Sequence, residues 1–320
     1  MCSHFTRSLL IGSLSTFHLK IAFLMQTVAP KYERPTSLLS ALSLLKQGFL
    51  PIAGGTDYYP GKVGKPLVDN LLDLSAIADF DVVGNPIGFG QSLSALTTWR
   101  QCQLDFHSGK LPVWCAALAQ SAKDVGGWQV QNRGTLGGNL CNASPAADGV
   151  VALLALGGQV LLVKKASDSA DEAFKARSLH IADFVLGNRL TAKQPDELLT
   201  QIYLPDHSAN ARSVFLKLGH RKYLVISIVM VGLLLDFDLD GHVVTCRIAI
   251  GSCTKAALRV TALENQVIGY HRREVMKIVT TSIAEIVSAI QPIDDVRGTS
   301  QYRKSAAQEL VLRAFAEVMQ

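Results

Sequence analysis

Residues 132–148 read NRGTLGGNLCNASPAAD, and this stretch is the most informative part of the chain. Its paired glycines, Gly137 and Gly138, stand between Thr135 and Asn139. Glycine lets a backbone approach a ligand closely, and successive N–H groups can form a concave site for an anion. A threonine hydroxyl adds a donor for phosphate oxygens. The stretch therefore predicts a glycine-bearing loop that contacts phosphate.

A second glycine pair follows a short apolar strand predicted over residues 49–53, within the stretch PIAGGTD at residues 51–57. Two such loops that face each other could clamp a pyrophosphate from both sides, as a dinucleotide such as FAD requires. Taken alone, either pair is equally compatible with an ordinary tight turn. The predicted cofactor-binding residues are Ala53, Gly54, Gly55, Thr56, Asp57, Thr135, Leu136, Gly137, Gly138 and Asn139.

Other nucleotide folds and several classes of partner are excluded by the sequence. It contains neither G-x-G-x-x-G nor G-x-x-x-x-G-K-[ST], which argues against a Rossmann domain and a P-loop. The net charge of +5 is spread along the chain without clustered aromatic residues, so nucleic-acid binding is not expected. The six cysteines have no metal-ligand spacing and are interpreted as free thiols in a reducing cytoplasm.

The chain of 320 residues is long enough for two domains, and the pattern changes at a polar segment over residues 205–211. Before it, apolar periodicity predicts a helix at 36–48, capped by Thr36, and further helices and strands. After it, three strands with a hairpin turn at Asp240-Gly241 precede a helical remainder. The second domain is therefore predicted to be α+β, with an antiparallel sheet.

The first 24 residues form a separate problem. Their apolar run is interrupted by His18 and Lys20, so it suits neither a membrane span nor a clean export signal. We interpret residues 1–24 as an extension outside the fold, and Met25 is a second possible start of the protein. The predicted domains are then 25–205 and 210–320.

Three separated stretches resemble one known family. Residues 51–57 and 132–148 are similar to the two FAD loops of the flavoprotein subunits of molybdenum hydroxylases, of the xanthine dehydrogenase and carbon monoxide dehydrogenase type. The sequence PIDDVRGTSQYR at residues 292–303 resembles a signature of the small C-terminal domain in that family. The resemblance runs from about Thr27 to the end of the chain, and the three motifs stand in the order of the family.

The resemblance implies an α+β fold with a two-part FAD-binding domain, of the vanillyl-alcohol-oxidase-like (PCMH) type, followed by a small C-terminal domain. It implies partner subunits that carry a molybdopterin centre and [2Fe-2S] clusters. Electrons would pass through the clusters to FAD and on to NAD or another acceptor, with no catalytic side chain and no metal on this chain. Asp148 falls where the family carries an acid that bonds cofactor hydroxyls, whereas its position alone also allows a helix N-cap.

Two other functions stay open at this point. The chain could be a stand-alone FAD-dependent oxidoreductase of the same superfamily, although residues 49–63 offer no histidine or cysteine for a covalent flavin. It could also be a structural subunit that has lost FAD, although both glycine pairs are intact. The substrate of the assembly is not predicted, because the resemblance places that site on another chain.

Overall fold

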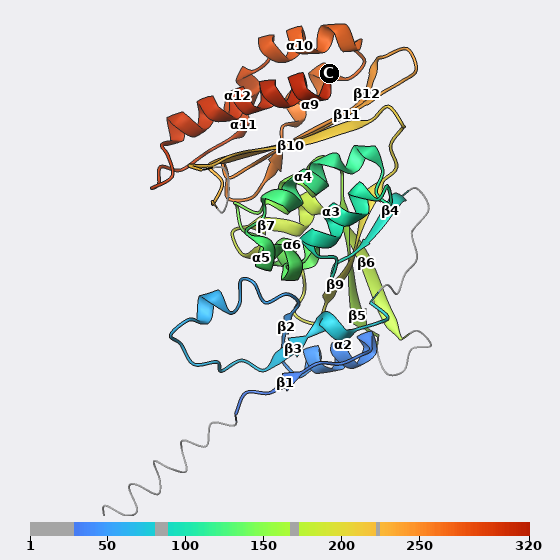
Figure 1. The fold of residues 1–320 in the computed structure, drawn as a ribbon, viewed down its shortest axis with the longest axis vertical. Coiled ribbons are helices and arrows are strands. Elements are labelled where there is room, and N and C mark those ends of the chain that lie inside the picture. Colours follow the sequence, from blue (N-terminus) through green and yellow to red (C-terminus); the bar gives the residue numbers. More distant parts are fainter. Residues whose placement is uncertain (1–28, 81–88, 167–172, 222–224) are drawn as a thin grey trace, which may run out of the picture.

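The computed structural model describes residues 29–80, 89–166, 173–221 and 225–320. The predicted N-terminal extension, and a strand predicted near residues 81–83, lie outside this part of the chain. Three layers follow one another along the long axis of the molecule (Figure 1): a small N-terminal unit, a middle unit, and a C-terminal unit covered by helices. None of the described helices combines the length and apolar character needed to cross a membrane.

The N-terminal unit is a small parallel sheet beside one helix. Its strands lie in the order β1-β3-β2, with β1 (Tyr32–Glu33), β2 (Leu50–Ile52) and β3 (Leu71–Asp73). Helix α2 (Leu38–Lys46) is capped by Ser37, one residue later than predicted. The carboxylate of Asp79 accepts a hydrogen bond from the Leu38 N–H at 2.8 Å, so the first turn is fixed from a second segment. Two short 3-10 turns complete the unit, η1 (Pro60–Lys62) and η2 (Leu74–Ala76).

The middle unit packs an antiparallel sheet against a group of helices. The strand order is β4-β9-β5-β6. The strands are β4 (Phe89–Ser94), β5 (Gln159–Lys165), β6 (Phe174–His180) and β9 (Leu198–Pro205), and β7 (Val185–Gly187) pairs with β8 (Leu190–Thr191). The helices are α3 (Trp99–His107), η3 (Val113–Cys115), α4 (Ala116–Asp124), α5 (Trp128–Arg133), α6 (Leu136–Asn142), α7 (Asp148–Ala155) and α8 (Ile181–Phe184). The polar residues 165–178, rich in serine, aspartate and alanine, predict a surface loop, and strand β6 occupies the second part of that segment.

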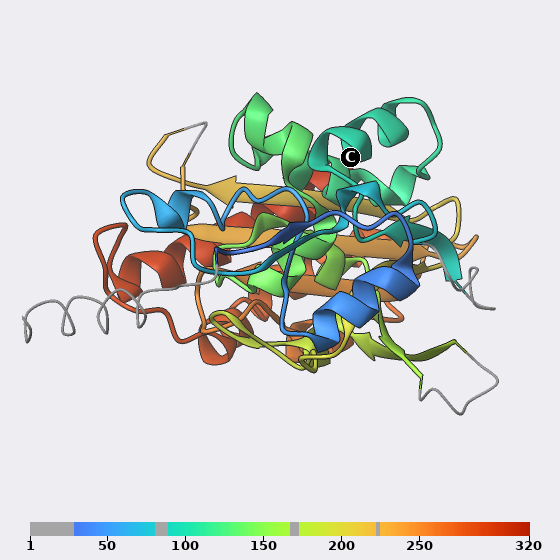
Figure 2. The ribbon, with the colours of Figure 1, turned by 90° about the horizontal axis from the view of Figure 1, so that it is seen from below.

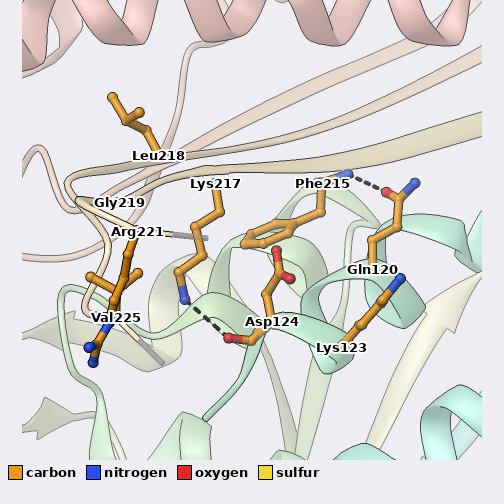
Figure 3. Close-up of a pocket in the computed structure, with 9 residues that line it drawn as sticks. All are labelled: Gln120, Lys123, Asp124, Phe215, Lys217, Leu218, Gly219, Arg221 and Val225. Carbon is orange, nitrogen blue, oxygen red and sulfur yellow. Dashed lines mark hydrogen bonds between the residues drawn. The ribbon is translucent and has the colours of Figure 1, made fainter. Parts of the chain in front are cut away.

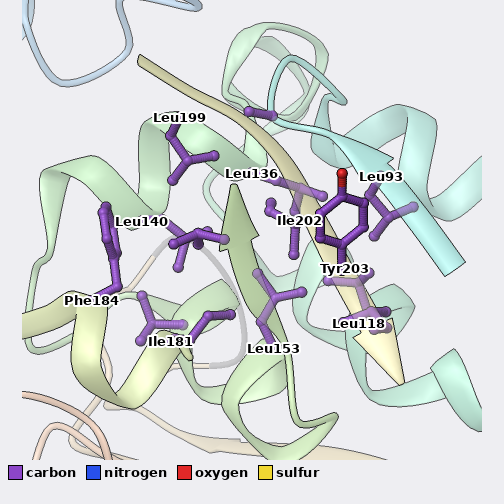
Figure 4. Close-up of a cluster of buried hydrophobic side chains, with 14 of the residues drawn as sticks. Leu93, Leu118, Leu136, Leu140, Leu153, Ile181, Phe184, Leu199, Ile202 and Tyr203 are labelled. Atoms are coloured by element: carbon purple, nitrogen blue, oxygen red, sulfur yellow. The ribbon is translucent and has the colours of Figure 1, made fainter. Parts of the chain in front are cut away.

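The core of the middle unit forms where α6 and α7 meet the sheet (Figure 4). Leu136 and Leu140, one helical turn apart on α6, are fully buried and lie with Leu153 of α7 against Ile202 of β9. Burying a leucine side chain stabilises a fold by about 1.5–3 kcal/mol. The second glycine motif is therefore anchored by its own apolar residues.

The C-terminal unit is an antiparallel sheet covered on both faces, as the ribbon seen from two directions indicates (Figures 1 and 2). Its order is β10-β11-β12-β13, with β10 (Arg212–Leu218), β11 (Val229–Phe237), β12 (Val243–Gly251) and β13 (Leu258–Arg259). One face carries α9 (Thr261–Val267), α10 (Arg272–Thr281), α11 (Ala284–Ala289) and α12 (Ser300–Val318). Helices α4 and α7 of the middle unit pack on the other face.

Strand β11 is buried along its whole length because both faces of the sheet are covered. Met230 and Leu234 join the core of the middle unit, while Val231 and Leu233 join the core beneath α9–α12. Gly232 lies against α7, where an added Cβ would stand 3.0 Å from Ala155 Cβ. The predicted α+β architecture is confirmed, with an antiparallel sheet and helices after the polar segment.

The motif at residues 292–303 closes the C-terminal unit through a buried arginine. The Arg303 side chain is 1% exposed and donates to Ile228 O at 2.9 Å, Ser252 O at 2.8 Å and Asp295 Oδ1 at 2.6 Å. Burial works to raise the pKa of Asp295, but hydrogen bonds from Arg297 and Arg303 outweigh it and hold that pKa at about 2. Through these hydrogen bonds the motif joins the start of α12 to the sheet.

Arg303→Lys should lower the free energy of unfolding by about 2–3 kcal/mol, because an ammonium cannot reproduce the fork that reaches two carbonyls and a carboxylate. Chemical denaturation followed by tryptophan fluorescence measures this loss. The matched control is Arg313→Lys on the same helix, where the arginine is exposed and pairs with Glu309 at 2.7 Å. Equal stability of the two variants would contradict the assignment.

Candidate cofactor site

The first glycine loop follows strand β2 and presents a series of backbone amide donors. Its backbone turns at Gly55, which has φ +67°, and an added Cβ there would stand 2.6 Å from the ring of Tyr59. Within the described part of the chain, the N–H groups of residues 54–58 have no hydrogen-bond acceptor. Unpaired amide donors in a row are suited to an anion.

The two glycine motifs are in direct contact. A Cβ added at Gly54 would lie only 1.8 Å from the carbonyl oxygen of Arg133 and 3.0 Å from the nitrogen of Gly134. A glycine is therefore required at position 54, where two backbones pass each other. The predicted opposition of the loops across a common site rests on this contact.

The second motif is a helix, and the prediction of a loop over residues 134–142 was wrong. Thr135 is the N-cap of α6, and its hydroxyl accepts a hydrogen bond from the Gly138 N–H at 3.0 Å. The N–H groups of Leu136 and Gly137 donate to Thr97 O and Ala95 O, and that of Asn139 donates to Thr135 O. All four amides are thus used within the protein, unlike those of the first loop.

Trp99 supports this helix from below and was not singled out in the sequence. Its side chain is buried, and its ring would stand 2.3 Å from a Cβ at Gly149. Its backbone N–H donates to Gly134 O at 3.2 Å. Two glycines thus let one indole pack beneath the second motif. The sequence does contain both glycines, but it does not show that they pack against Trp99, because this residue lies far from them in the chain.

A cavity of about 570 Å³ lies between the two motifs, within the range of cofactor pockets. Eight of the predicted residues line it: Ala53, Gly54, Gly55, Thr56, Asp57, Thr135, Gly138 and Asn139. Leu136 and Gly137 do not, because Leu136 points into the core and Gly137 packs on Ala95. Tyr58, Arg189 and Lys193 line the cavity without having been predicted. The Oδ1 of Asn139 is buried without a hydrogen-bond partner among the described residues, and a Cβ added at Gly149 would stand 2.8 Å from it, so this oxygen lies on the side of α7.

Asp148 belongs neither to this cavity nor to a helix cap. The N-cap of α7 is Ala147, and the Asp148 carboxylate accepts hydrogen bonds from Lys217 Nζ and from Ser227 Oγ, each at 3.0 Å. Both charged side chains are at most 10% exposed. Burial raises the pKa of Asp148 to about 6 in spite of Lys217. The carboxylate thus joins the middle unit to β10, an interaction that the sequence did not predict.

A second cavity of about 530 Å³ is lined in part by Lys217 (Figure 3). Lys217 Nζ also donates to Asp124 O at 3.2 Å, and Phe215 N donates to Gln120 Oε1 at 2.7 Å. Arg221 and Val225 form its outer rim at the end of β10. Asp124 lines this cavity, and the next residue in the chain, Val125, lines the first. Cationic side chains, among them Lys217 and Arg221, line this second cavity.

Gly138→Val should weaken FAD binding about 10-fold, because the side chain enters the cavity while the fold tolerates it. An added Cβ meets only Thr135 Oγ1, at 3.0 Å, so the cost to the fold is the helix cap, about 1 kcal/mol. Titration of the apoprotein with FAD, followed by flavin fluorescence, gives the affinity. Thr299→Ala is the control, since it removes a threonine cap of the same kind from α12, at a residue that does not line the cavity. Equal affinities for the two variants would argue against this wall of the site.

An amide-rich glycine loop and a capped helix in contact with it, followed by a separate α+β unit, form a site suited to a phosphate-bearing cofactor. The model of the FAD binding domain in molybdopterin dehydrogenase matches residues 25–207, and that of the CO dehydrogenase flavoprotein C-terminal domain matches residues 215–318. The chain belongs to the family of FAD-binding medium subunits of molybdenum hydroxylases, and its cofactor is FAD.

Individual relatives agree over nearly their whole length. The chain is 29% identical to the glyceraldehyde dehydrogenase medium chain of Sulfolobus acidocaldarius, covering 90% of this chain and 97% of that one. It is 26% identical to the carbon monoxide dehydrogenase medium chain of Afipia carboxidovorans, covering 88% and 94%. A crystal structure of the Cu,Mo-CO dehydrogenase matches with a TM-score of 0.76 at 25% identity, covering 91% of this chain and 98% of the other. The likeness makes the chain a subunit of oxidoreductase type.

Proposed function

We propose that this chain carries electrons from the [2Fe-2S] clusters of a small subunit, by way of FAD, to NAD or another acceptor. The assembly would include a large subunit with molybdopterin. The main support within the chain is the row of amides at residues 54–58, which have no acceptor among the described residues and line one cavity together with Asn139. Relatives named as medium chains or medium subunits support the assembly.

The residues present fit FAD. The amides of the first loop would donate to the pyrophosphate, and Asn139 lines the same cavity on the second motif. Gly138 has no side chain, so the cofactor can approach the backbone of the second motif closely. When bound, FAD supplies one-electron and two-electron redox chemistry, which lets it link iron–sulfur clusters to a hydride acceptor.

We further propose that Lys217 positions the flavin end of the cofactor. Its ammonium group is held by Asp148 and by Asp124 O, and the side chain lines the second cavity. Two of its three N–H groups are used, so one remains for a ligand acceptor. Since Asp148 balances the charge of Lys217, the pair can lie in the interior without a bound anion. The role of Asp148 would then be indirect, through Lys217.

A reducing compartment suits this function. The five cysteines in the described part of the chain are free, and four of them are buried. Burial raises the pKa of Cys102 and Cys253 to about 12, so these thiols stay protonated and unreactive. We propose the cytoplasm as the location, in line with unpaired thiols.

The test combines cofactor analysis with native purification. The tagged chain purified from its own cells should release FAD and not FMN on denaturation, and should bring down an iron–sulfur subunit and a molybdopterin subunit. Stopped-flow absorbance at the flavin band should then register reduction by the substrate of the complex and reoxidation by NAD. An active, molybdenum-free monomer would support the stand-alone oxidoreductase instead, and a colourless, folded chain that ignores added FAD would refute the proposal.

A further inference from the structure

The cavity between the glycine motifs has two cations in its wall, and the inference drawn from them rests on the proposed binding of FAD. Among the described residues that line this cavity, Arg189 and Lys193 are the only positively charged ones, and Asp57 is the only carboxylate. The amides of the first loop bring donors but no net charge. A pyrophosphate in this cavity would therefore depend on these two side chains for charge neutralisation.

Arg189 is held in an unusual conformation at the turn between β7 and β8. Its φ is +55°, and its N–H donates at 3.0 Å to the carbonyl of Ala143, which itself has φ +47°. Non-glycine residues in this region are strained, and such strain persists where the surroundings hold it, often at ligand sites. The turn thus fixes the backbone from which the Arg189 side chain extends to the cavity wall.

The Arg189 side chain is itself anchored on the second motif. Its Nη1 donates to Asn142 Oδ1 at 3.0 Å, and Asn142 also lines the cavity. A guanidinium group has five N–H donors, so four remain after this contact. The planar fork suits phosphate oxygens, which accept two parallel hydrogen bonds from it.

Lys193 is fixed by two backbone carbonyls. Its ammonium group donates to Gln194 O and to Glu197 O, each at 3.1 Å, which leaves one N–H for a ligand. The contacts use neutral oxygens, so the positive charge of Lys193 is not cancelled by a salt bridge there. Both cations thus have fixed positions and unused donors.

We propose that Arg189 and Lys193 form a cationic wall that binds the pyrophosphate of FAD opposite the amides of the first glycine loop. The wall makes the site select a dinucleotide with a diphosphate bridge over riboflavin, which has no phosphate. Arg189 is the stronger contact, because its fork can bind two oxygens at once. ADP, which carries a diphosphate without a flavin ring, binds at the same wall.

The test titrates the full-length apoprotein with FAD, ADP and riboflavin by calorimetry. Arg189→Gly should raise the Kd for FAD and for ADP about 10- to 100-fold, the range for a lost charge-assisted hydrogen bond. Its Tm should equal or exceed that of the wild type, because glycine relieves the strained φ. Lys193→Gln should raise the Kd less. Both variants should lose part of the salt dependence of FAD binding, and the Kd for riboflavin should not change.

The exposed Arg313→Gln, on α12, is the matched control for the loss of one positive charge, and it should bind all three ligands as the wild type does. Wild-type Kd values for FAD and ADP in Arg189→Gly would overturn the proposal. A parallel loss of riboflavin binding and of Tm would also overturn it, since that outcome marks a structural residue. If the wild-type chain itself binds no FAD, the proposed function fails and not this assignment alone.

Discussion

Gly54→Ala should abolish measurable FAD binding, with a Kd raised at least 100-fold. The new methyl carbon would stand 1.8 Å from the carbonyl oxygen of Arg133, a contact that no side-chain rotation can relieve, because both atoms are fixed by backbone. The two motifs must then move apart. Amides of the first loop and the wall at Gly138 could no longer contact one pyrophosphate at the same time.

Gly61→Ala in the same segment is the matched control for the loss of a glycine. An added Cβ there meets nothing within 4 Å, so both the affinity for FAD and the Tm should stay at wild-type values. Calorimetric titration with FAD measures the affinity. The far-UV circular dichroism spectrum of Gly54→Ala should stay near that of the wild type. Wild-type affinity in Gly54→Ala would mean that the contact between the motifs does not build the site.

Lys217→Met should lower the free energy of unfolding by about 3–5 kcal/mol at pH 7.5, because it leaves the Asp148 carboxylate buried without its cation. The loss depends on pH in a defined direction. In the folded chain the pKa of Asp148 is already about 6, raised by burial against the effect of Lys217, compared with about 3.9 for a free aspartate. The folded state thus holds the proton more tightly, and this group's contribution to stability falls as the pH rises from about 4 to about 6.

Without Lys217 the folded pKa of Asp148 rises further, so the fall in stability extends to higher pH. The loss in free energy of unfolding that Lys217→Met causes should therefore be smaller at pH 5 than at pH 7.5. Adding Asp148→Asn should recover more than half of the loss, and Lys277→Met at an exposed site should have no effect. Urea denaturation at both pH values measures these differences. A deficit that is independent of pH, or that the second substitution does not reduce, would contradict the buried pair.

The fold class was predictable because its signals are local. Apolar periodicity located most helices and strands, and the Asp240-Gly241 turn between β11 and β12 is where it was predicted, with φ +84° at Gly241. The helix at the second motif was missed because two glycines in seven residues lower helix propensity. Tertiary packing of Leu136 and Leu140, with the Thr135 cap, overrides that propensity. The i, i+4 leucines after a threonine were the available signal.

The candidate site was predictable in its glycines and not in its charges. Gly54 and Gly138 stand in recognisable motifs, whereas Asp148 and Lys217 meet across 69 residues and Arg189 contacts Asn142 across 47. Periodicity carries no information on such long-range pairs, which depend on how two units pack. The pairing of Asp148 with Lys217, rather than with a cofactor or a helix end, is a product of that packing.

The sheet of the C-terminal unit has a consequence for modularity. Its middle strand contributes Met230 and Leu234 to one core and Val231 and Leu233 to another, while Gly232 admits α7 to close range. A cut in the polar segment before β10 would strip apolar surface from both halves, and neither half could bury it again alone. Shuffling of this C-terminal unit between relatives therefore requires co-adaptation of the face that meets α4 and α7. Such a shared sheet favours inheritance of the two units together, because each is stable only when packed on the other.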